Sequence, residues 1–321
     1  MNNPTAKSAI VPRVTGLLIL EVRKSNPNGD PERESSPRQR PDGRGEISPV
    51  SIKRKLRDLV EAKPEALWEM IQKRVSLPPG FDYDIMESRE RGWKELKEQD
   101  EQKRANEAWG KTSELMRTGY PKFEAKYWDA RLFGNTFLEK AGEDKGIQNT
   151  IRAGTAHFGV GVSLAPIEIE FSTWTKKAPA QEDKTRGMAP MAFKVIKHAV
   201  FAVPFFVNPS QAAKTGCTAE DVAIMLNLLP FAYSHTSSVI RTMVDVRHVH
   251  VVQHTDSVGS FSDFALIDAL TPKRKAEFDV TKPSESADEY QFPTWDEIKG
   301  TSPRPGRPKF EELGKHHDYA L

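Results

Sequence analysis

The chain has 321 residues with a formal net charge of +2, and 37% of them are hydrophobic, which is enough for a sizeable core. Its single cysteine, Cys217, excludes an internal disulfide, and we expect it to be a small buried or surface residue and not a nucleophile. No apolar run approaches the roughly 18 residues of a membrane span and no export signal is evident, so we expect a cytoplasmic protein without a membrane partner.

The first predicted elements are a strand and a helix separated by a long loop. An apolar run at residues 17–22 belongs to a strand that begins near Val14 and ends in a turn at residues 26–31. Ser48 and Pro49 then have the residue types of an N-cap and a first helical position. We expect this helix to end by Lys63.

Positive charge is concentrated between the end of this strand and the start of this helix. Residues 23–57 contain ten Lys and Arg residues and five Asp and Glu residues. Such clustering is typical of a surface that binds nucleic acid. A solvated helix face explains the same charges without a ligand, and charge alone does not decide between the two.

Residues 64–130 are expected to form a helical insertion. Apolar residues at helical spacing over 65–75 predict a helix with one buried face. Residues 86–107 alternate in charge, which is typical of an exposed helix with ion pairs between successive turns.

The remaining elements complete a recognisable order. Strands are predicted at 156–171 and 192–207, a helix capped by Thr218 follows, and a last strand lies at about 242–252. The order strand, helix, strand, strand, helix, strand predicts an α+β fold with ferredoxin-like (RRM-type) βαββαβ topology over residues 14–270. Residues 271–321 mix charges with proline and are expected to be a C-terminal extension, flexible or draped over the surface.

Three histidines share parity along the last predicted strand and would face one side of the sheet if that strand continued to residue 254. They are His248, His250 and His254, and we identify no acidic or cysteine partner beside them in the sequence. A zinc site needs three or four ligands, so we predict no metal and interpret these residues as a strand surface near nucleic acid. Three glycines mark close backbone approach but form no nucleotide-binding loop, so no cofactor is expected: Gly154, Gly159 and Gly161.

Three short segments, by their order and spacing, resemble the crRNA-binding backbone subunit of type I CRISPR Cascade complexes, a RAMP-superfamily protein. They are the turn at residues 26–30, the helix start at 51–57 and the run at 128–134, followed by a glycine-containing strand at 156–162. The chain looks closest to the I-B and I-C branches. The loop at 32–46 and the tail after Thr271 match no pattern of the family.

The resemblance implies a palm at residues 14–270, interrupted by fingers at 64–130 and by a β-hairpin thumb at 175–192. It implies that the turn and the helix start hold RNA, through Asn26, Asn28, Gly29, Lys53, Arg54 and Arg57. A purely structural turn is the alternative for the asparagines. The thumb would add Lys176, Lys177, Lys184, Arg186 and Met188, with Met188 as an apolar wedge that displaces a base. A mobile surface hairpin is the alternative.

Two functions are compatible with this resemblance. The first is a binding module without catalytic residues, metal or cofactor: copies polymerise head to tail along crRNA and present it to target DNA, together with other Cascade subunits and a helicase-nuclease. The second is a metal-dependent, RNA-guided ribonuclease of type III character that uses Asp30 or Asp183. No paired carboxylates accompany either residue, so the sequence favours the binding module.

Overall fold

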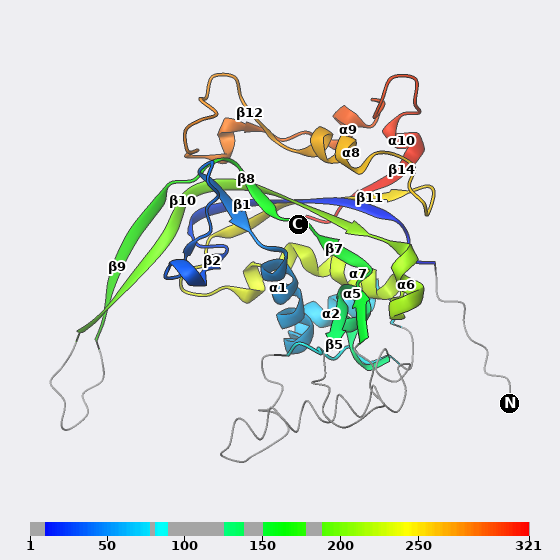
Figure 1. The fold of residues 1–321 in the computed structure, drawn as a ribbon, viewed down its shortest axis with the longest axis horizontal. Helices are drawn as coiled ribbons and strands as arrows, with labels where there is room; N and C mark the ends of the chain where they lie inside the picture. Colours follow the sequence, from blue (N-terminus) through cyan, green and yellow to red (C-terminus); the bar gives the residue numbers. More distant parts are fainter. Residues whose placement is uncertain (1–9, 78–80, 89–124, 138–149, 178–187, 321) are drawn as a thin grey trace, which may run out of the picture.

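An antiparallel sheet forms the centre of the molecule in the computed structural model, which describes residues 10–77, 81–88, 125–137, 150–177 and 188–320 (Figure 1). From edge to edge its strands are β14 (Gly314–Asp318), β11 (Val244–His254), β1 (Val14–Ser25), β10 (Met188–Val207), β8 (Gly161–Pro166) and β4 (Arg44–Ile47). Two further strands, β7 (Ala156–Phe158) and β9 (Ile169–Lys177), also pair with β10. The predicted α+β class is therefore confirmed.

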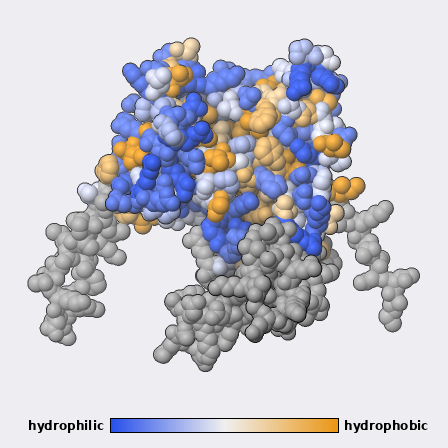
Figure 2. Space-filling model, viewed as in Figure 1, coloured by the Kyte–Doolittle hydropathy of each residue, from blue (hydrophilic) through white to orange (hydrophobic). Residues whose placement is uncertain are grey.

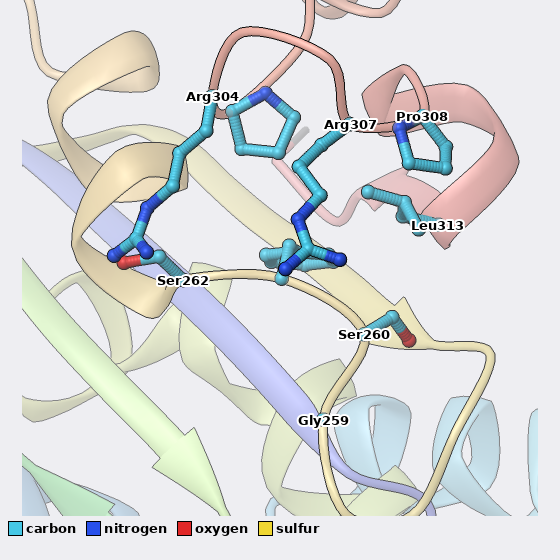
Figure 3. Close-up of a pocket in the computed structure, with 9 residues that line it drawn as sticks. Gly259, Ser260, Ser262, Arg304, Arg307, Pro308 and Leu313 are labelled. Atoms are coloured by element: carbon cyan, nitrogen blue, oxygen red, sulfur yellow. The ribbon is translucent and has the colours of Figure 1, made fainter.

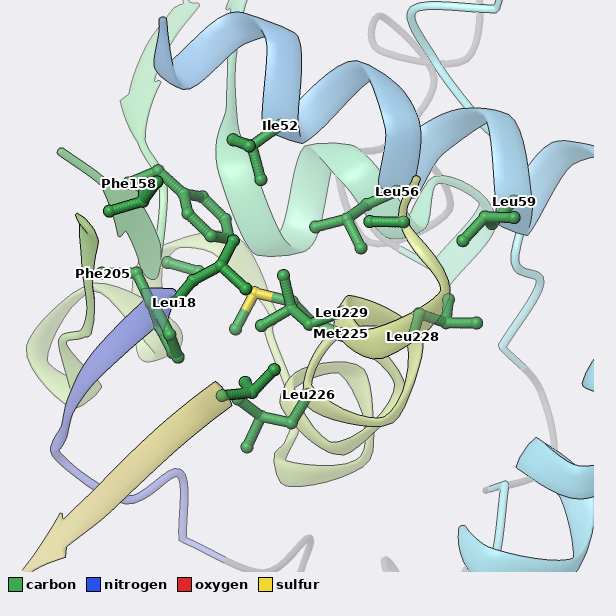
Figure 4. Close-up of a cluster of buried hydrophobic side chains, with 14 of the residues drawn as sticks. Leu18, Ile52, Leu56, Leu59, Phe158, Phe205, Met225, Leu226, Leu228 and Leu229 are labelled. Carbon is green, nitrogen blue, oxygen red and sulfur yellow. The ribbon is translucent and has the colours of Figure 1, made fainter. Parts of the chain in front are cut away.

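Helices cover one face of this sheet (Figure 1). They are α1 (Pro49–Ala62), α2 (Glu65–Arg74), α5 (Trp128–Phe133), α6 (Pro209–Thr215) and α7 (Ala219–Leu228). The main core lies between them and the sheet, where Leu18, Ile52, Phe205 and Met225 are fully buried (Figure 4). A Cβ atom at Gly16 would lie 2.1 Å from the Phe205 ring, so β1 needs a glycine there to admit this packing.

Side-chain caps begin α1 and α7. Ser48 Oγ accepts a hydrogen bond from the Ser51 N–H at 3.3 Å, and Lys63 ends α1 in the left-handed region. Thr218 and Asp221 form a reciprocal capping box at the start of α7. The predicted starts of both helices are confirmed because each rests on contacts within a few residues.

The continuous strand predicted at 156–171 is wrong. The chain forms β7, β8 and β9 in succession, and the first break lies at Gly159, whose added Cβ would come 2.8 Å from Pro204 Cγ. Pro166 ends β8 because proline cannot donate to a ladder. β9 and β10 then pair from Ile169 with Ile196 to Lys177 with Met188, which gives a long β-hairpin.

The C-terminal segment forms a third layer and not a loose extension. It contains α8 (Asp263–Leu270), β12 (Lys273–Arg274), β13 (Tyr290–Gln291), α9 (Trp295–Ile298) and α10 (Phe310–Leu313), and it lies across the second face of the sheet (Figure 1). A separate apolar cluster joins it to the sheet, where Leu17 and Ile19 of β1 meet Leu266 and Phe310. The expectation of a flexible extension is wrong, whereas the alternative, a segment that lies over the surface of the sheet, agrees with this packing. The apolar residues that hold the segment are spread among charges in the sequence, so no local pattern marks them.

Both faces of the sheet are consequently covered, by helices on one side and by the C-terminal layer on the other. Hydrophilic side chains occupy much of the face seen in Figure 2, and apolar residues are interspersed among them. Among the residues that the structure describes, no helix is long and apolar enough to cross a membrane.

Candidate nucleic-acid interface

A groove of about 530 Å³ lies where the turn after β1 meets the start of α1. Its third wall is the loop that precedes β11. The groove is lined by Asn28, Gly29, Ser48, Val50, Ser51, Arg54, Lys55, Asp58, Thr236, Ser237, Ser238 and Arg241. Three of these side chains are cationic and one is anionic, so the groove has a positive character that suits a polyanion.

The two asparagines of the turn build the groove wall. Asn28 Oδ1 accepts hydrogen bonds from the N–H and the hydroxyl of Ser48, at 2.7 and 2.8 Å, which fixes the turn against the start of α1. Asn26 is fully buried, and its Nδ2 donates to the Ser35 carbonyl at 2.7 Å. The structural alternative therefore holds for Asn26, whereas Asn28 and Gly29 line the groove itself.

Two basic residues of α1 face the groove. Arg54 is 21% exposed, its Nε lies 3.3 Å from Asp58 Oδ1 and its Nη1 donates to the Glu87 carbonyl at 2.7 Å. Lys55 is buried: its Nζ donates to Thr236 Oγ1 at 3.0 Å and lies 4.3 Å from the centroid of the Tyr233 ring. Both side chains line the groove wall and contribute positive potential to it.

The groove lining does not include Lys53 or Arg57, whose side chains both pack against the ring of Phe133. Arg57 is 5% exposed and its Nε lies 2.9 Å from Asp129 Oδ2, in a buried ion pair. Lys53 packs 5.2 Å from the centroid of Phe133, and burial, assisted by the nearby Arg57 charge, lowers its pKa. Because residues 53 and 57 are about one helical turn apart, their side chains point in the same direction, toward α5.

The loop before β11 supplies groove residues that the sequence reasoning missed. Arg241 donates from Nε to the Asn26 carbonyl at 2.9 Å, while Ser237 and Ser238 are exposed beside it. One feature of the sequence could have indicated this part of the groove: residues 234–242, directly before a strand, consist mostly of Ser, Thr and Arg. It carries no motif, and only the pairing of β11 with β1 brings it beside the turn.

The expected thumb residues fall on the β9 and β10 hairpin or beyond it. Lys177 pairs through its backbone with Met188, and Lys176 with Ala189. Lys184 and Arg186 lie outside the described residues.

The three histidines of β11 lie beneath the C-terminal layer, so their interpretation as a surface near nucleic acid is wrong. His250 and His254 are 3% and 5% exposed, and burial lowers the pKa of His250 to about 4. An acidic partner does lie beside His248 and His250 in space: it is Asp318, from β14. His254 instead contacts the Thr15 hydroxyl at 2.9 Å.

A second hollow, of about 580 Å³, lies within the C-terminal layer (Figure 3). Arg304 and Arg307 extend from their loop toward the segment that carries Ser260 and Ser262. This hollow is separated from the groove by the sheet, and the two do not form one site.

Comparison with known families identifies the chain. The family model of CRISPR-associated protein Cas7 matches residues 12–294, which include the turn, α1 and the loop before β11. This chain belongs to the Cas7 family. The CRISPR assignment made from the turn and the helix start is thereby confirmed at the level of the family.

Solved structures similar to this Cas7 protein also come from CRISPR complexes. A chain of a "CRISPR RNA-guided surveillance complex, pre-nicking" is 15% identical with a TM-score of 0.44, and the match covers 76% of this chain and 79% of that one. A chain of a "CRISPR RNA-guided surveillance complex" is 17% identical with a TM-score of 0.42, over 83% and 78%. A chain of the Type III-B Cmr-beta bound to cognate target RNA is 13% identical with a TM-score of 0.37, over 75% and 61%. No curated protein matches the chain.

Proposed function

We propose that this Cas7 protein is the crRNA-binding backbone subunit of a type I CRISPR surveillance complex, of the I-B or I-C branch. The observation that carries the proposal is the positive groove at the start of α1, within the residues that match the family. RNA-recognition domains with an open sheet bind bases on that sheet, but both faces of this sheet are covered. The RNA therefore follows the groove.

Phosphates are the part of the RNA that the groove suits best. Arg54 and Arg241 supply charge, Ser237 and Ser238 supply hydroxyl donors, and the first turn of α1 opens into the same space. These contacts hold the backbone and do not read bases, which leaves the bases free to pair with target DNA.

The domain organisation is part of the proposal. The strand order β11, β1, β10, β8 with α1 and α7 on one face supports a ferredoxin-like palm over residues 14–270. Fingers correspond to residues 64–130. The β9 and β10 hairpin, with residues 175–192 at its end, is the thumb, and Lys176, Lys177, Lys184, Arg186 and Met188 would bring it against RNA held by the next copy.

In such contacts one surface of a copy meets a different surface of the next copy. Copies therefore add head to tail along the crRNA and build an open filament. Other Cascade subunits and a helicase-nuclease complete the assembly.

We propose that the subunit is not a nuclease. Asp30 Oδ1 accepts a hydrogen bond from the Glu32 N–H at 3.2 Å and lies 3.9 Å from Arg38, so turn chemistry accounts for it. Asp183 lies outside the described residues. Incubating the assembled complex with matched RNA or DNA and Mg²⁺, without the helicase-nuclease, separates the two functions: cut strands would favour the ribonuclease.

The salt dependence of RNA binding tests the groove. Single-strand binding loses about 0.7 log units of affinity per log unit of salt for each phosphate neutralised. We expect the double variant Arg54→Gln and Arg241→Gln to flatten this slope by about 1.4 per subunit and to weaken all RNA sequences alike. Lys73→Gln, an exposed residue of α2, is the control. An unchanged slope in a variant that melts normally would remove the groove from the proposal.

A further inference from the structure

The last strand of the chain brings four polar side chains together on the sheet face that the C-terminal layer covers. β14 pairs antiparallel with β11, so that His250 lies opposite Asp318 and Val252 opposite His316. His248 Nδ1 lies 2.8 Å and His250 Nδ1 lies 3.7 Å from the same oxygen, Asp318 Oδ2. His316 Nε2 lies 3.2 Å from His250 Nδ1.

These separations fit one small cation. In a tetrahedral zinc site with bonds of about 2.0–2.2 Å, neighbouring ligand atoms are about 3.3–3.6 Å apart. The observed separations of 2.8, 3.2 and 3.7 Å lie on both sides of that value. The ligand atoms of His248, His250 and Asp318 all lie within 4.8 Å of one another, so shifts of a few tenths of an ångström to about one ångström bring them onto a common centre.

The surroundings fix the orientation of each ligand. Asp318 Oδ1 accepts hydrogen bonds from the N–H groups of Val249 and Ala320, at 2.9 and 3.0 Å, which leaves Oδ2 directed at the two imidazoles. Trp295 of α9 stacks on the His316 ring at 4.6 Å. The His248 and His250 rings stack on each other at 4.8 Å. Groups that orient ligands in this way typically strengthen metal binding by ten- to a hundredfold.

We propose that His248, His250 and Asp318 bind a divalent transition metal, with His316 as the fourth ligand. Imidazole nitrogens and one carboxylate are a ligand set that zinc accepts. The site lies on the opposite face of the sheet from the RNA groove, and two of its ligands lie beyond residue 294, where the family match ends. Its role is structural: the metal fastens the final strand to β11 and so closes the C-terminal layer over the sheet.

Metal analysis of the full-length protein, purified without a metal-affinity column, tests this site. We expect elemental mass spectrometry to find one zinc per chain. Adding a chelator should lower the melting temperature, and adding zinc back should restore it. His248→Gln and Asp318→Asn should each weaken zinc binding by at least about tenfold and abolish the chelator effect. His316→Gln should weaken binding while keeping a metal that the other three ligands hold.

His317→Gln is the matched control, since His317 is exposed on the same strand and its ring packs against Tyr319. It should keep both the metal and the chelator effect. The measurement on wild-type protein remains a test even if a ligand variant fails to fold. The proposal would be overturned by wild-type protein that contains no metal and whose melting temperature does not change with added zinc, cobalt or nickel.

Discussion

A buried ion pair with two hydrogen bonds joins α5 to α7. Arg131 donates from Nε and Nη2 to both oxygens of Asp221, each at 2.9 Å, and the two side chains are 0% and 1% exposed. Asp221 is also the capping residue of α7. A change at Arg131 therefore leaves a buried carboxylate without its main partner.

We expect Arg131→Met to lower the free energy of unfolding by roughly 3–5 kcal/mol, because the unpaired charge stays buried. Urea unfolding of the RNA-free protein measures the loss. Lys73→Met is the control: its pair with Glu69 is 77% and 57% exposed and should be worth at most about 0.5 kcal/mol. Equal losses in both variants would contradict this role for Arg131.

His198 makes stability depend on pH. It is 2% exposed, its Nδ1 lies 2.9 Å from Ser284 Oγ, and Glu21, Glu289 and Arg23 are the charged groups around it. Burial lowers its pKa, although the Glu21 carboxylate opposes that shift. As pH falls below about 6.5, the unfolded chain binds a proton that the folded chain excludes until its own lower pKa is reached, so stability declines over that window.

We expect His198→Gln to reduce this decline by at most about 1.4 kcal/mol per pH unit. Urea unfolding at pH 7.5, 6.5 and 5.5 measures it, against His317→Gln, whose exposed ring should change nothing. An identical pH dependence in wild type and His198→Gln would exclude a contribution from this residue.

The residue roles that could be predicted were those with partners close in the sequence. Ser48 and Thr218 cap helices through contacts three residues away. The ion pair of Arg57 could not be predicted, because its partner, Asp129, is 72 residues distant and no local pattern reveals it. Arg241 was missed for the same reason, since it reaches the turn across 215 residues.

Among the elements, the C-terminal layer differs most from its prediction. Its apolar residues are separated by charged and proline residues, so no helical or strand periodicity marks them. The layer nevertheless packs against the sheet through buried apolar residues, which include Leu270, Tyr290 and Phe310. β1, α1 and α7 were predictable because each carries its own periodicity and caps.

Phe310→Ala tests whether this layer stabilises the fold. Phe310 is 2% exposed and meets the Phe261 ring edge to face at 5.7 Å, so we expect a loss of about 3–5 kcal/mol on unfolding. Val280→Ala, at a side chain that is 60% exposed, should have little effect. Similar small losses in both variants would restore the flexible-tail interpretation.

At the scale of the whole molecule, the proposed thumb, the hairpin of β9 and β10, should matter for assembly and not for folding. Deleting residues 178–187 joins two paired strand ends, Lys177 and Met188, and leaves both apolar cores in place. We expect the melting temperature by circular dichroism to change little, and mass photometry of the copurified complex to show shorter filaments. Full-length filaments would argue against the thumb, and a collapsed melting temperature would place these residues in the core.

The position of β1 in the sheet has a consequence for synthesis of the chain. β1 is made first, yet its neighbours are β10 and β11, and Val14 pairs with Val207. At translation rates of about 5–20 residues per second, roughly 10–40 s separate the emergence of β1 from that of its first partner. Throughout that time this apolar strand has no partner strand, so we expect nascent chains to engage chaperones until β10 has been made.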